Sequence, residues 1–272
     1  MMLTEEDVGL VLRCVHEQAG LVFAPEKHYL VENRVEKLAL MRGMETRPLL
    51  QALRDGNIEL RAQVAEAMAI QETYFFRDPW FFESLRTDVL PSLIRRRRAE
   101  RSLQIWSAAC STGQEVWSVA MLLAQMPELA GWDIQIVGSD FSPAALEKAR
   151  SGCYSHMEVN RGLPARELAT HFRRQGLGWE VGTELRRNVR FCAINLIDVW
   201  PQLPRFDIVL LRNVLIYFDA AARREVLQRA RGVMRQDGFL FLGGGESPQG
   251  VVDSFLPGLS GRSCYYRLRE DA

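Results

Sequence analysis

Several features that would assign this chain to a specialised class are missing from its sequence. No apolar run approaches the roughly 20 residues that a membrane-spanning helix needs, so we expect no direct membrane insertion. The opening residues, MMLTEEDVGL, are acidic and polar, so we expect no secretory signal peptide. Basic and acidic residues number 34 each, and the resulting net charge of zero supplies no overall attraction to nucleic acid or to an anionic surface.

Cysteine and histidine are scarce and dispersed. The five cysteines contain no CxxC pair, which favours reduced thiols and a cytoplasmic protein over a disulfide framework. The four histidines show no metal-ligand spacing, so we expect no metal site. The GxGxxG turn of dinucleotide-binding sheets is also absent, which argues against a dinucleotide ligand.

The first 85 residues are predicted to be helical throughout. Apolar residues recur at helical spacing from Pro25 to Arg42, and a further helix is predicted from Ile58 to about Thr73. The polar side of the Pro25–Arg42 helix is basic, with Lys27, Arg34, Lys37 and Arg42. Spacing alone favours a solvated helix face over a partner-binding face.

An aromatic segment, Gln71 to Pro79, follows these helices. In one interpretation Tyr74, Phe75 and Phe76 wedge the helical domain onto the next domain. In the other, the turn covers a ligand, and Thr73 and Arg77 supply polar contacts.

A helix is then predicted from Pro79 to Arg98, and it ends in four consecutive arginines. A basic run can indicate nucleic-acid binding. No aromatic residues are interleaved with these arginines, so a solvated helix C-terminus, where cations favour the helix dipole, is the better interpretation.

The stretch Leu103 to Glu115 (LQIWSAACSTGQE) organises the remainder. A short apolar strand, a turn of small residues and a helix from Gln114 form the opening unit of a doubly wound α/β sheet. Strands and helices alternate after it, with strands predicted at Ile134–Ser139, Val189–Ala193, Phe206–Leu211, Phe239–Leu242 and Ser263–Leu268. Between about residues 170 and 190 we predict a small inserted β-subdomain. The fold class is therefore α/β.

The ligand of this sheet is predicted from the residues at the strand ends. The first turn holds one glycine, Gly113, which suits a cofactor without phosphate such as S-adenosylmethionine. Glu115 and Asp140 would repel phosphates but favour a sulfonium, and Asp140 can accept from ribose hydroxyls. Asp140 can equally cap the helix that begins at Pro143, and the sequence leaves both roles open.

Ordered motifs along nearly the whole chain resemble the CheR-type chemotaxis receptor (protein-glutamate) O-methyltransferases. They comprise Gln71–Arg77, Ser107–Glu115, Gly138–Asp140, Lys148–Tyr154, Asn195–Leu196 and, most specifically, FDIVLLRNVLIYFD at Phe206–Asp219. The resemblance implies a helical substrate-recognition domain (residues 1–85) and a Rossmann-like S-adenosylmethionine-dependent methyltransferase domain (residues 86–272). It implies methylation of glutamate side chains on cytoplasmic chemoreceptor helices, with S-adenosyl-L-homocysteine as product.

The resemblance also assigns site residues. Cofactor contacts fall on Gln71, Thr73, Arg77, Glu115, Asp140, Asn195, Leu196, Arg212 and Asn213. Arg77 and Tyr217 are implied to lie nearest the transferred methyl group. The basic helix becomes the receptor-facing surface, with Arg34, Lys37 and Arg42, in place of a solvated face.

The chain departs from the family pattern at Gln71, Gln114 and Gly244. A short segment at residues 173–184 favours recognition without a C-terminal pentapeptide tether on the receptor. We expect a monomer that binds no nucleic acid. Alternatives are methylation of a small molecule or another protein, and a cofactor-sensing regulatory module with weak or no transferase activity, which Gln71 and Gly244 keep open.

Overall fold

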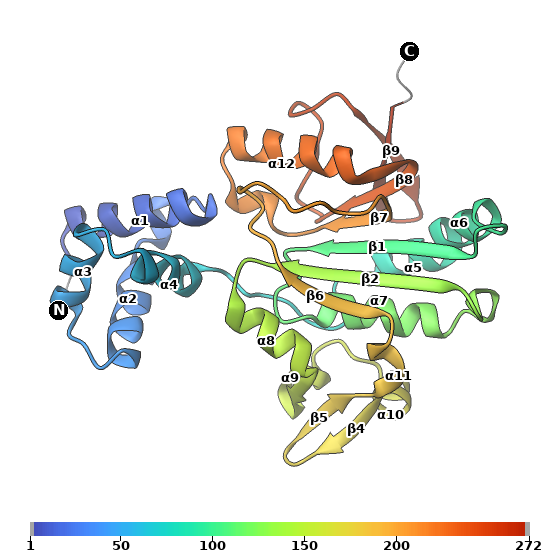
Figure 1. Cartoon of the computed structure of the whole chain (residues 1–272), viewed down its shortest axis with the longest axis horizontal. Helices are drawn as coiled ribbons and strands as arrows, with labels where there is room; N and C mark the ends of the chain where they lie inside the picture. The colour runs from blue at the N-terminus through green and yellow to red at the C-terminus, as the bar shows by residue number, and fades with distance from the viewer. Residues whose placement is uncertain (1–2, 270–272) are drawn as a thin grey trace. The chain divides into compact units, whose positions relative to one another are not determined.

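The computed structural model describes residues 3–269, and these residues form two compact units (Figure 1). The helical unit comprises residues 3–70 and 216–223, and the α/β unit comprises residues 71–215 and 224–269. Residues 71–85, assigned above to the helical domain, thus lie in the α/β unit. Within residues 3–269 no helix is both long and apolar enough to cross a membrane.

The helical unit contains four α-helices, a short 3₁₀ helix and the segment after residue 215. The helices are α1 (Glu5–Ala19), α2 (Tyr29–Met41), α3 (Thr46–Arg54) and α4 (Ile58–Met68), with the 3₁₀ turn at Pro25–Lys27. A capping box between Thr4 and Asp7 starts α1, and Gly20 ends it with a left-handed backbone (φ 69°). The Leu21 backbone pairs with Phe218, which joins the later segment to this unit.

Helix α4 ends five residues earlier than predicted. One Nη of Arg34 donates to the carbonyls of Met68 and Ala69 at 2.6 and 2.9 Å, so the C-terminal carbonyls already have a side-chain donor. Ala69 is extended (φ −62°, ψ 145°), and the helical pattern we extended to Thr73 is therefore wrong beyond Met68.

The main sheet of the α/β unit has seven strands in the order β6-β2-β1-β7-β8-β10-β9. Their bounds are β1 (Ser102–Ala108), β2 (Asp133–Asp140), β6 (Val189–Ala193), β7 (Phe206–Leu211), β8 (Met234–Leu242), β9 (Phe255–Ser260) and β10 (Ser263–Leu268). The first five are parallel, and β10 is antiparallel to both β8 and β9. All six residues of β7 are buried, as is typical of a central parallel strand.

Helices connect these strands. They are α5 (Pro79–Ser84), α6 (Leu90–Arg96), α7 (Gln114–Ala124), α8 (Pro143–Ser151), α9 (His156–Asn160), α10 (Ala165–His171), α11 (Thr183–Arg186) and α12 (Ala220–Val233), with 3₁₀ turns at Pro127–Leu129 and Leu215–Tyr217. The helix predicted from Pro79 to Arg98 is divided by a π-helical turn at Leu85–Val89. The alternation confirms the α/β fold class.

A second, three-stranded sheet forms the inserted subdomain, with the order β3-β5-β4 (Figure 1). Its strands are β3 (Cys153–Ser155), β4 (Phe172–Gln175) and β5 (Gly178–Val181). A β-subdomain is present in the predicted region and is antiparallel, but it begins earlier than residue 170, because its first strand, β3, starts at Cys153. Residues 183–186, within the predicted region, are helical.

Candidate functional site

The turn after β1 has an unusual backbone. Ala109, Ser111 and Gly113 all have positive φ (57°, 52° and 93°). A Cβ on Gly113 would lie 2.8 Å from the Cβ of Ala149 on α8, so no larger residue fits there. Helix α7 begins immediately afterwards, at Gln114. In the sheet β1 lies between β2 and β7, where the strand order reverses, and ligands bind such sheets at this point.

Asp140 ends β2 beside this turn and is only 4% exposed. One carboxylate oxygen accepts from the Ser111 amide (2.8 Å) and the other from the Ser142 amide (3.0 Å). Burial raises the pKa of Asp140, opposed by these amide bonds and by a side-chain hydrogen bond from Gln71. The helix cap is Ser142, whose hydroxyl accepts from the Ala145 amide, so the capping role left open for Asp140 is wrong.

Glu115, in the first turn of α7, and Arg212, the residue after β7, form a largely buried ion pair. The Arg212 guanidinium donates to Glu115 Oε2 and to Asp78 Oδ2, both at 2.6 Å, and its side chain is 2% exposed. The Ser107 hydroxyl donates to the second Glu115 oxygen at 2.8 Å. Arg212 also lies 4.1 Å over the Phe81 ring. It therefore ties the segment before α5 to the sheet edge.

The aromatic segment packs inside the α/β unit. Phe75 is fully buried and makes edge-to-face contacts with Tyr154 and Phe172, at centroid distances of 5.0 and 5.6 Å. These contacts replace the proposed wedge between domains for this side chain. The Phe76 amide donates to the hydroxyl of Ser118 on α7 (3.0 Å).

Polar residues of the same segment are half-buried. Arg77 donates to the Glu72 carbonyl at 2.7 Å and lies 5.7 Å from the Tyr74 ring, while its own carbonyl accepts from Arg212 at 3.2 Å. Thr73 lies between Glu72 and Tyr74 in the chain and is half-buried. The segment thus brings Gln71 and Arg77 to the strand ends that carry Asp140 and Arg212.

The loops after β6, β7 and β8 complete this edge. Glu246 accepts from the amides of Asn213 (2.7 Å) and Gly243 (2.6 Å), which fixes Asn213 in a left-handed conformation (φ 60°). Asn195 follows β6 and donates to Asp198 (3.0 Å), and Leu196 beside it is buried. Because β6 pairs with β2, Asn195 lies near the end of Asp140's strand.

Four predicted residues belong to the helical unit. Tyr217 ends a 3₁₀ turn, and its carbonyl accepts from the Val22 amide at 2.8 Å. Lys37 and Arg42 are exposed on and after α2, whereas Arg34 is half-buried against the end of α4.

Sequence reasoning missed Asp78, Ser107 and Glu246 as partners that hold the site. Glu246 had a local signal, since a carboxylate three residues after Gly243 can close a turn on its amide. Asp78 had none, because its partner Arg212 lies 134 residues away in the chain. Ser107 and Glu115 are eight residues apart, but a turn of unusual backbone lies between them, and no regular spacing indicates that they meet.

These residues fit a hydroxyl-bearing ligand without phosphate. The buried Ser111 hydroxyl has no hydrogen-bond partner among residues 3–269, although its amide is bonded to Asp140. The Asp140 carboxylate can accept further donors such as a ribose diol. Three carboxylates lie at this edge and would disfavour a phosphate: Asp140 at the end of β2, Glu115 in the first turn of α7 and Glu246 in the loop after β8. Across the described residues no cluster of His, Cys, Asp and Glu is arranged for a metal ion.

Comparisons with known proteins identify the family of this chain. Residues 71–257 match the model of the CheR methyltransferase, SAM binding domain. The chain is 37% identical to chemotaxis protein methyltransferase 1 of Pseudomonas aeruginosa over 263 residues, which cover 94% of this chain and 95% of that protein. It is 34% identical to the chemotaxis protein methyltransferase of Vibrio parahaemolyticus, over 94% of each chain.

The matched family accounts for the strand-end geometry, because S-adenosylmethionine carries a ribose diol and a sulfonium and has no phosphate. The α/β unit is therefore the S-adenosylmethionine-binding part of the chain, as predicted. With a family match over residues 71–257 and relatives aligned along nearly the full length, this chain belongs to the CheR methyltransferases, S-adenosylmethionine-dependent enzymes of chemotaxis.

Proposed function

We propose that this protein transfers the methyl group of S-adenosylmethionine to glutamate side chains on the cytoplasmic helices of chemoreceptors, giving γ-glutamyl methyl esters. The family and its chemotaxis relatives support this reaction. The observation that carries the choice of a carboxylate substrate is the placement of Arg77. Its backbone is held by Arg212 at the cofactor edge of the sheet, and a guanidinium is well suited to orient a carboxylate.

The proposed acceptor needs no general base. A glutamate side chain has a reference pKa of about 4.3, so it is already ionised near pH 7. Bound S-adenosylmethionine supplies an electrophilic methyl group. The protein's own residues contribute alignment of the two reactants, which converts a bimolecular step into an effectively unimolecular one.

Arg77 and Tyr217 have separate proposed roles. Arg77 has five N–H donors, of which one bonds the Glu72 carbonyl, and it orients the incoming carboxylate or the methionine part of the cofactor. Tyr217 hydrogen-bonds near the reacting atoms. Gln71, Thr73, Asn195, Leu196 and Asn213 contact the cofactor together with Glu115, Asp140 and Arg212.

The receptor contacts are proposed on α2. Lys37 and Arg42 are exposed and basic, as a surface for acidic receptor helices requires, while Arg34 supports that helix through its bonds to the end of α4. The inserted sheet offers strands of only four residues at β4 and β5, which favours recognition without a pentapeptide tether. We propose that the enzyme acts in the cytoplasm as a monomer.

Methyl transfer to receptor fragments tests the proposal. Purified cytoplasmic fragments of chemoreceptors, with and without a C-terminal pentapeptide, are incubated with the enzyme and tritiated S-adenosylmethionine. Base-labile release of labelled methanol is expected from both fragments. Base-stable label would exclude a carboxyl ester, and transfer only to the tethered fragment would overturn tether-free recognition.

Arg77→Ala tests the proposed alignment role. We expect a loss of about 10²-fold in the rate of methyl transfer, as for removal of one positioned donor. Arg161→Ala is the matched control, because Arg161 lies over the same Tyr74 ring at 4.6 Å and is exposed. Near-normal turnover of a folded Arg77→Ala enzyme would refute the assignment.

The same assay addresses the alternative of a cofactor-sensing module. Both departures that suggested it fit an intact site: Gln71 bonds the Asp140 carboxylate, and a Cβ on Gly244 would meet no atom within 4 Å. S-adenosylhomocysteine binding in calorimetry without any methyl transfer would favour the sensing module.

A further inference from the structure

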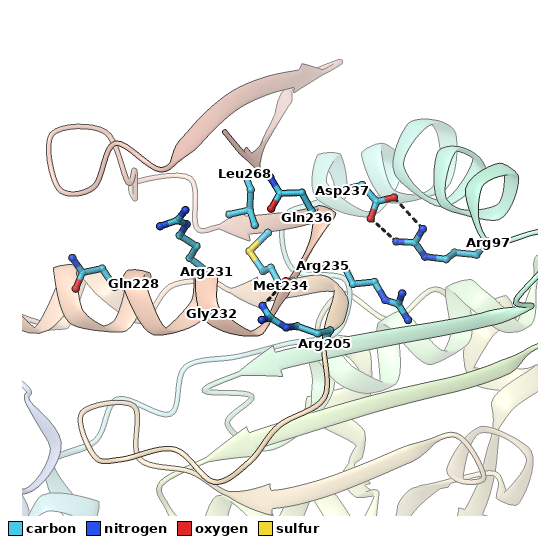
Figure 2. Close-up of a pocket in the computed structure, with 10 residues that line it drawn as sticks. All are labelled: Arg97, Arg205, Gln228, Arg231, Gly232, Met234, Arg235, Gln236, Asp237 and Leu268. Carbon is cyan, nitrogen blue, oxygen red and sulfur yellow. Dashed lines mark hydrogen bonds and ion pairs between the residues drawn. The ribbon is translucent and has the colours of Figure 1, made fainter. Parts of the chain in front are cut away.

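A cavity of about 650 Å³ lies away from the cofactor edge, at the opposite end of the parallel strands (Figure 2). Arg205 immediately precedes β7 and lines it, whereas Arg212 follows β7 at the cofactor edge. Since a strand rises about 3.3 Å per residue, β7 separates the two sites by roughly 20 Å. The other lining residues come from the ends of α12 and β10, the start of β8 and the residue after α6.

Arginine dominates the lining. Four of the ten lining residues are arginines (Arg97, Arg205, Arg231 and Arg235), and among residues 3–269 Asp237 is the one carboxylate of the lining. The remaining polar groups are the amides of Gln228 and Gln236. Guanidinium groups are donors only, so the cavity offers many donors and few acceptors. This imbalance favours an anionic ligand.

One of these arginines is part of the framework. Arg97 donates to Asp207 at 2.8 Å and to both oxygens of Asp237 at 3.0 and 2.5 Å, and its side chain is 8% exposed. Figure 2 shows the paired contact with Asp237. Arg97 is thereby paired with the carboxylate of the lining, Asp237, and with Asp207 behind it.

Arg235 and Arg205 are bound less completely by the protein. The buried Nε of Arg235 lies 3.4 Å from Asp207 and makes no hydrogen bond within residues 3–269, and Nη1 of Arg235 forms an ion pair with Glu100 at 3.5 Å. Arg205 donates to the Met234 carbonyl at 3.1 Å. Because a carbonyl is neutral, this hydrogen bond does not compensate the positive charge of Arg205. The Arg205 guanidinium can therefore gain charge-assisted hydrogen bonds from a ligand.

We propose that this cavity binds a small phosphate-bearing anion. Its volume is that of a small-molecule site, and guanidinium forks match phosphate oxygens in geometry and charge. No aromatic residue lines it to stack on a base, so the phosphate group is the recognised part. The arginine run at residues 95–98 contributes only Arg97 here, turned inward, which argues against an extended nucleic-acid surface.

Calorimetric titration of the full chain with inorganic pyrophosphate at constant ionic strength tests the proposal. We expect saturable binding with a dissociation constant below about 1 mM. Arg205→Gln and Arg231→Gln should each weaken it about tenfold, the effect of one lost charge-assisted bond. Arg187→Gln, at an exposed arginine outside the cavity, is the matched control and should bind as the parent does. Thermal unfolding of each variant verifies the fold.

Competition separates this cavity from the cofactor site. Saturating S-adenosylhomocysteine should leave pyrophosphate binding unchanged, and displacement would place the anion at the cofactor edge and overturn the proposal. The proposal is equally overturned by absence of saturable binding, or by equal weakening in the control and the cavity variants. Binding of single-stranded oligonucleotides in preference to pyrophosphate would assign the basic residues to nucleic acid instead. None of these results depends on methyl transfer.

Discussion

Replacement of Arg212 by methionine is expected to destabilise the α/β unit strongly. Methionine keeps the length and apolar stem but removes the cation that bonds Glu115 and Asp78. The Glu115 side chain is 14% exposed and would retain the hydrogen bond from the Ser107 hydroxyl. Removing one partner of a buried ion pair costs about 3–5 kcal/mol, because the remaining charge is left without compensation.

The two ion pairs contribute unequally. The Asp78 side chain is 47% exposed, so its ion pair with Arg212 should contribute less than about 1 kcal/mol to the free energy of unfolding, as exposed ion pairs do. Most of the loss should therefore arise at Glu115, and we expect about 3 kcal/mol in total. Adding Glu115→Gln should recover part of this loss, with a coupling energy of about 2 kcal/mol or more.

Urea unfolding followed by tryptophan fluorescence measures the effect. All six tryptophans of the chain lie between residues 80 and 200, within the α/β unit, so the signal reports that unit alone. Arg86→Gln is the control: its pair with Glu83 is more than half exposed on both sides, and we expect a loss below about 1 kcal/mol. A loss below about 1 kcal/mol for Arg212→Met, or strict additivity in the double variant, would refute the reasoning.

Three further predictions use other parts of the structure. Gly113→Ala should lower the free energy of unfolding by about 1–3 kcal/mol, because φ is 93° and the new Cβ would lie 2.8 Å from the Cβ of Ala149 on α8. Gly244→Ala is the control and should leave the free energy of unfolding unchanged in the same urea experiment, since its Cβ would meet no atom within 4 Å. The hydrogen bonds that Asp237 accepts from Arg97 hold the pKa of Asp237 below its usual range, so the stability that this pair contributes is present above about pH 4 and is lost as the pH falls further. Asp237→Asn should therefore flatten this part of a plot of unfolding free energy against pH, and an unchanged slope would contradict the pairing. Arg34→Met removes the donor at the end of α4 and should lower the urea midpoint at which the helical unit loses its circular dichroism signal, while the midpoint from tryptophan fluorescence, which reports the α/β unit, stays in place. A shift of both midpoints would contradict unfolding of the two units as separate steps.

Much of the α/β unit was predictable from local patterns. Strands β6, β7 and β10 have the predicted bounds, because each is a short run rich in apolar and aromatic residues that polar or turn residues delimit. Strands β3 and β9 were not predicted. Cys153–Ser155 is too short to show a period, and Phe255–Ser260 contains Pro257 and Gly258, which argue against a strand unless it lies at an edge, as β9 does.

By itself, the sequence determined the fold class, the order of the units and the kind of ligand. Asp140 could be selected because it directly follows a predicted strand, and Glu115 because it starts the helix after the first strand and turn; both positions lie at the same edge of a parallel sheet. Tertiary structure alone decided the partners: that Ser142 and not Asp140 caps α8, and that Arg212 bonds Glu115. The same holds for Arg97, one of four consecutive arginines with the same local signal. It is buried because Asp207 and Asp237, more than a hundred residues away, are brought to it by the ends of β7 and β8, and no local pattern encodes such a contact.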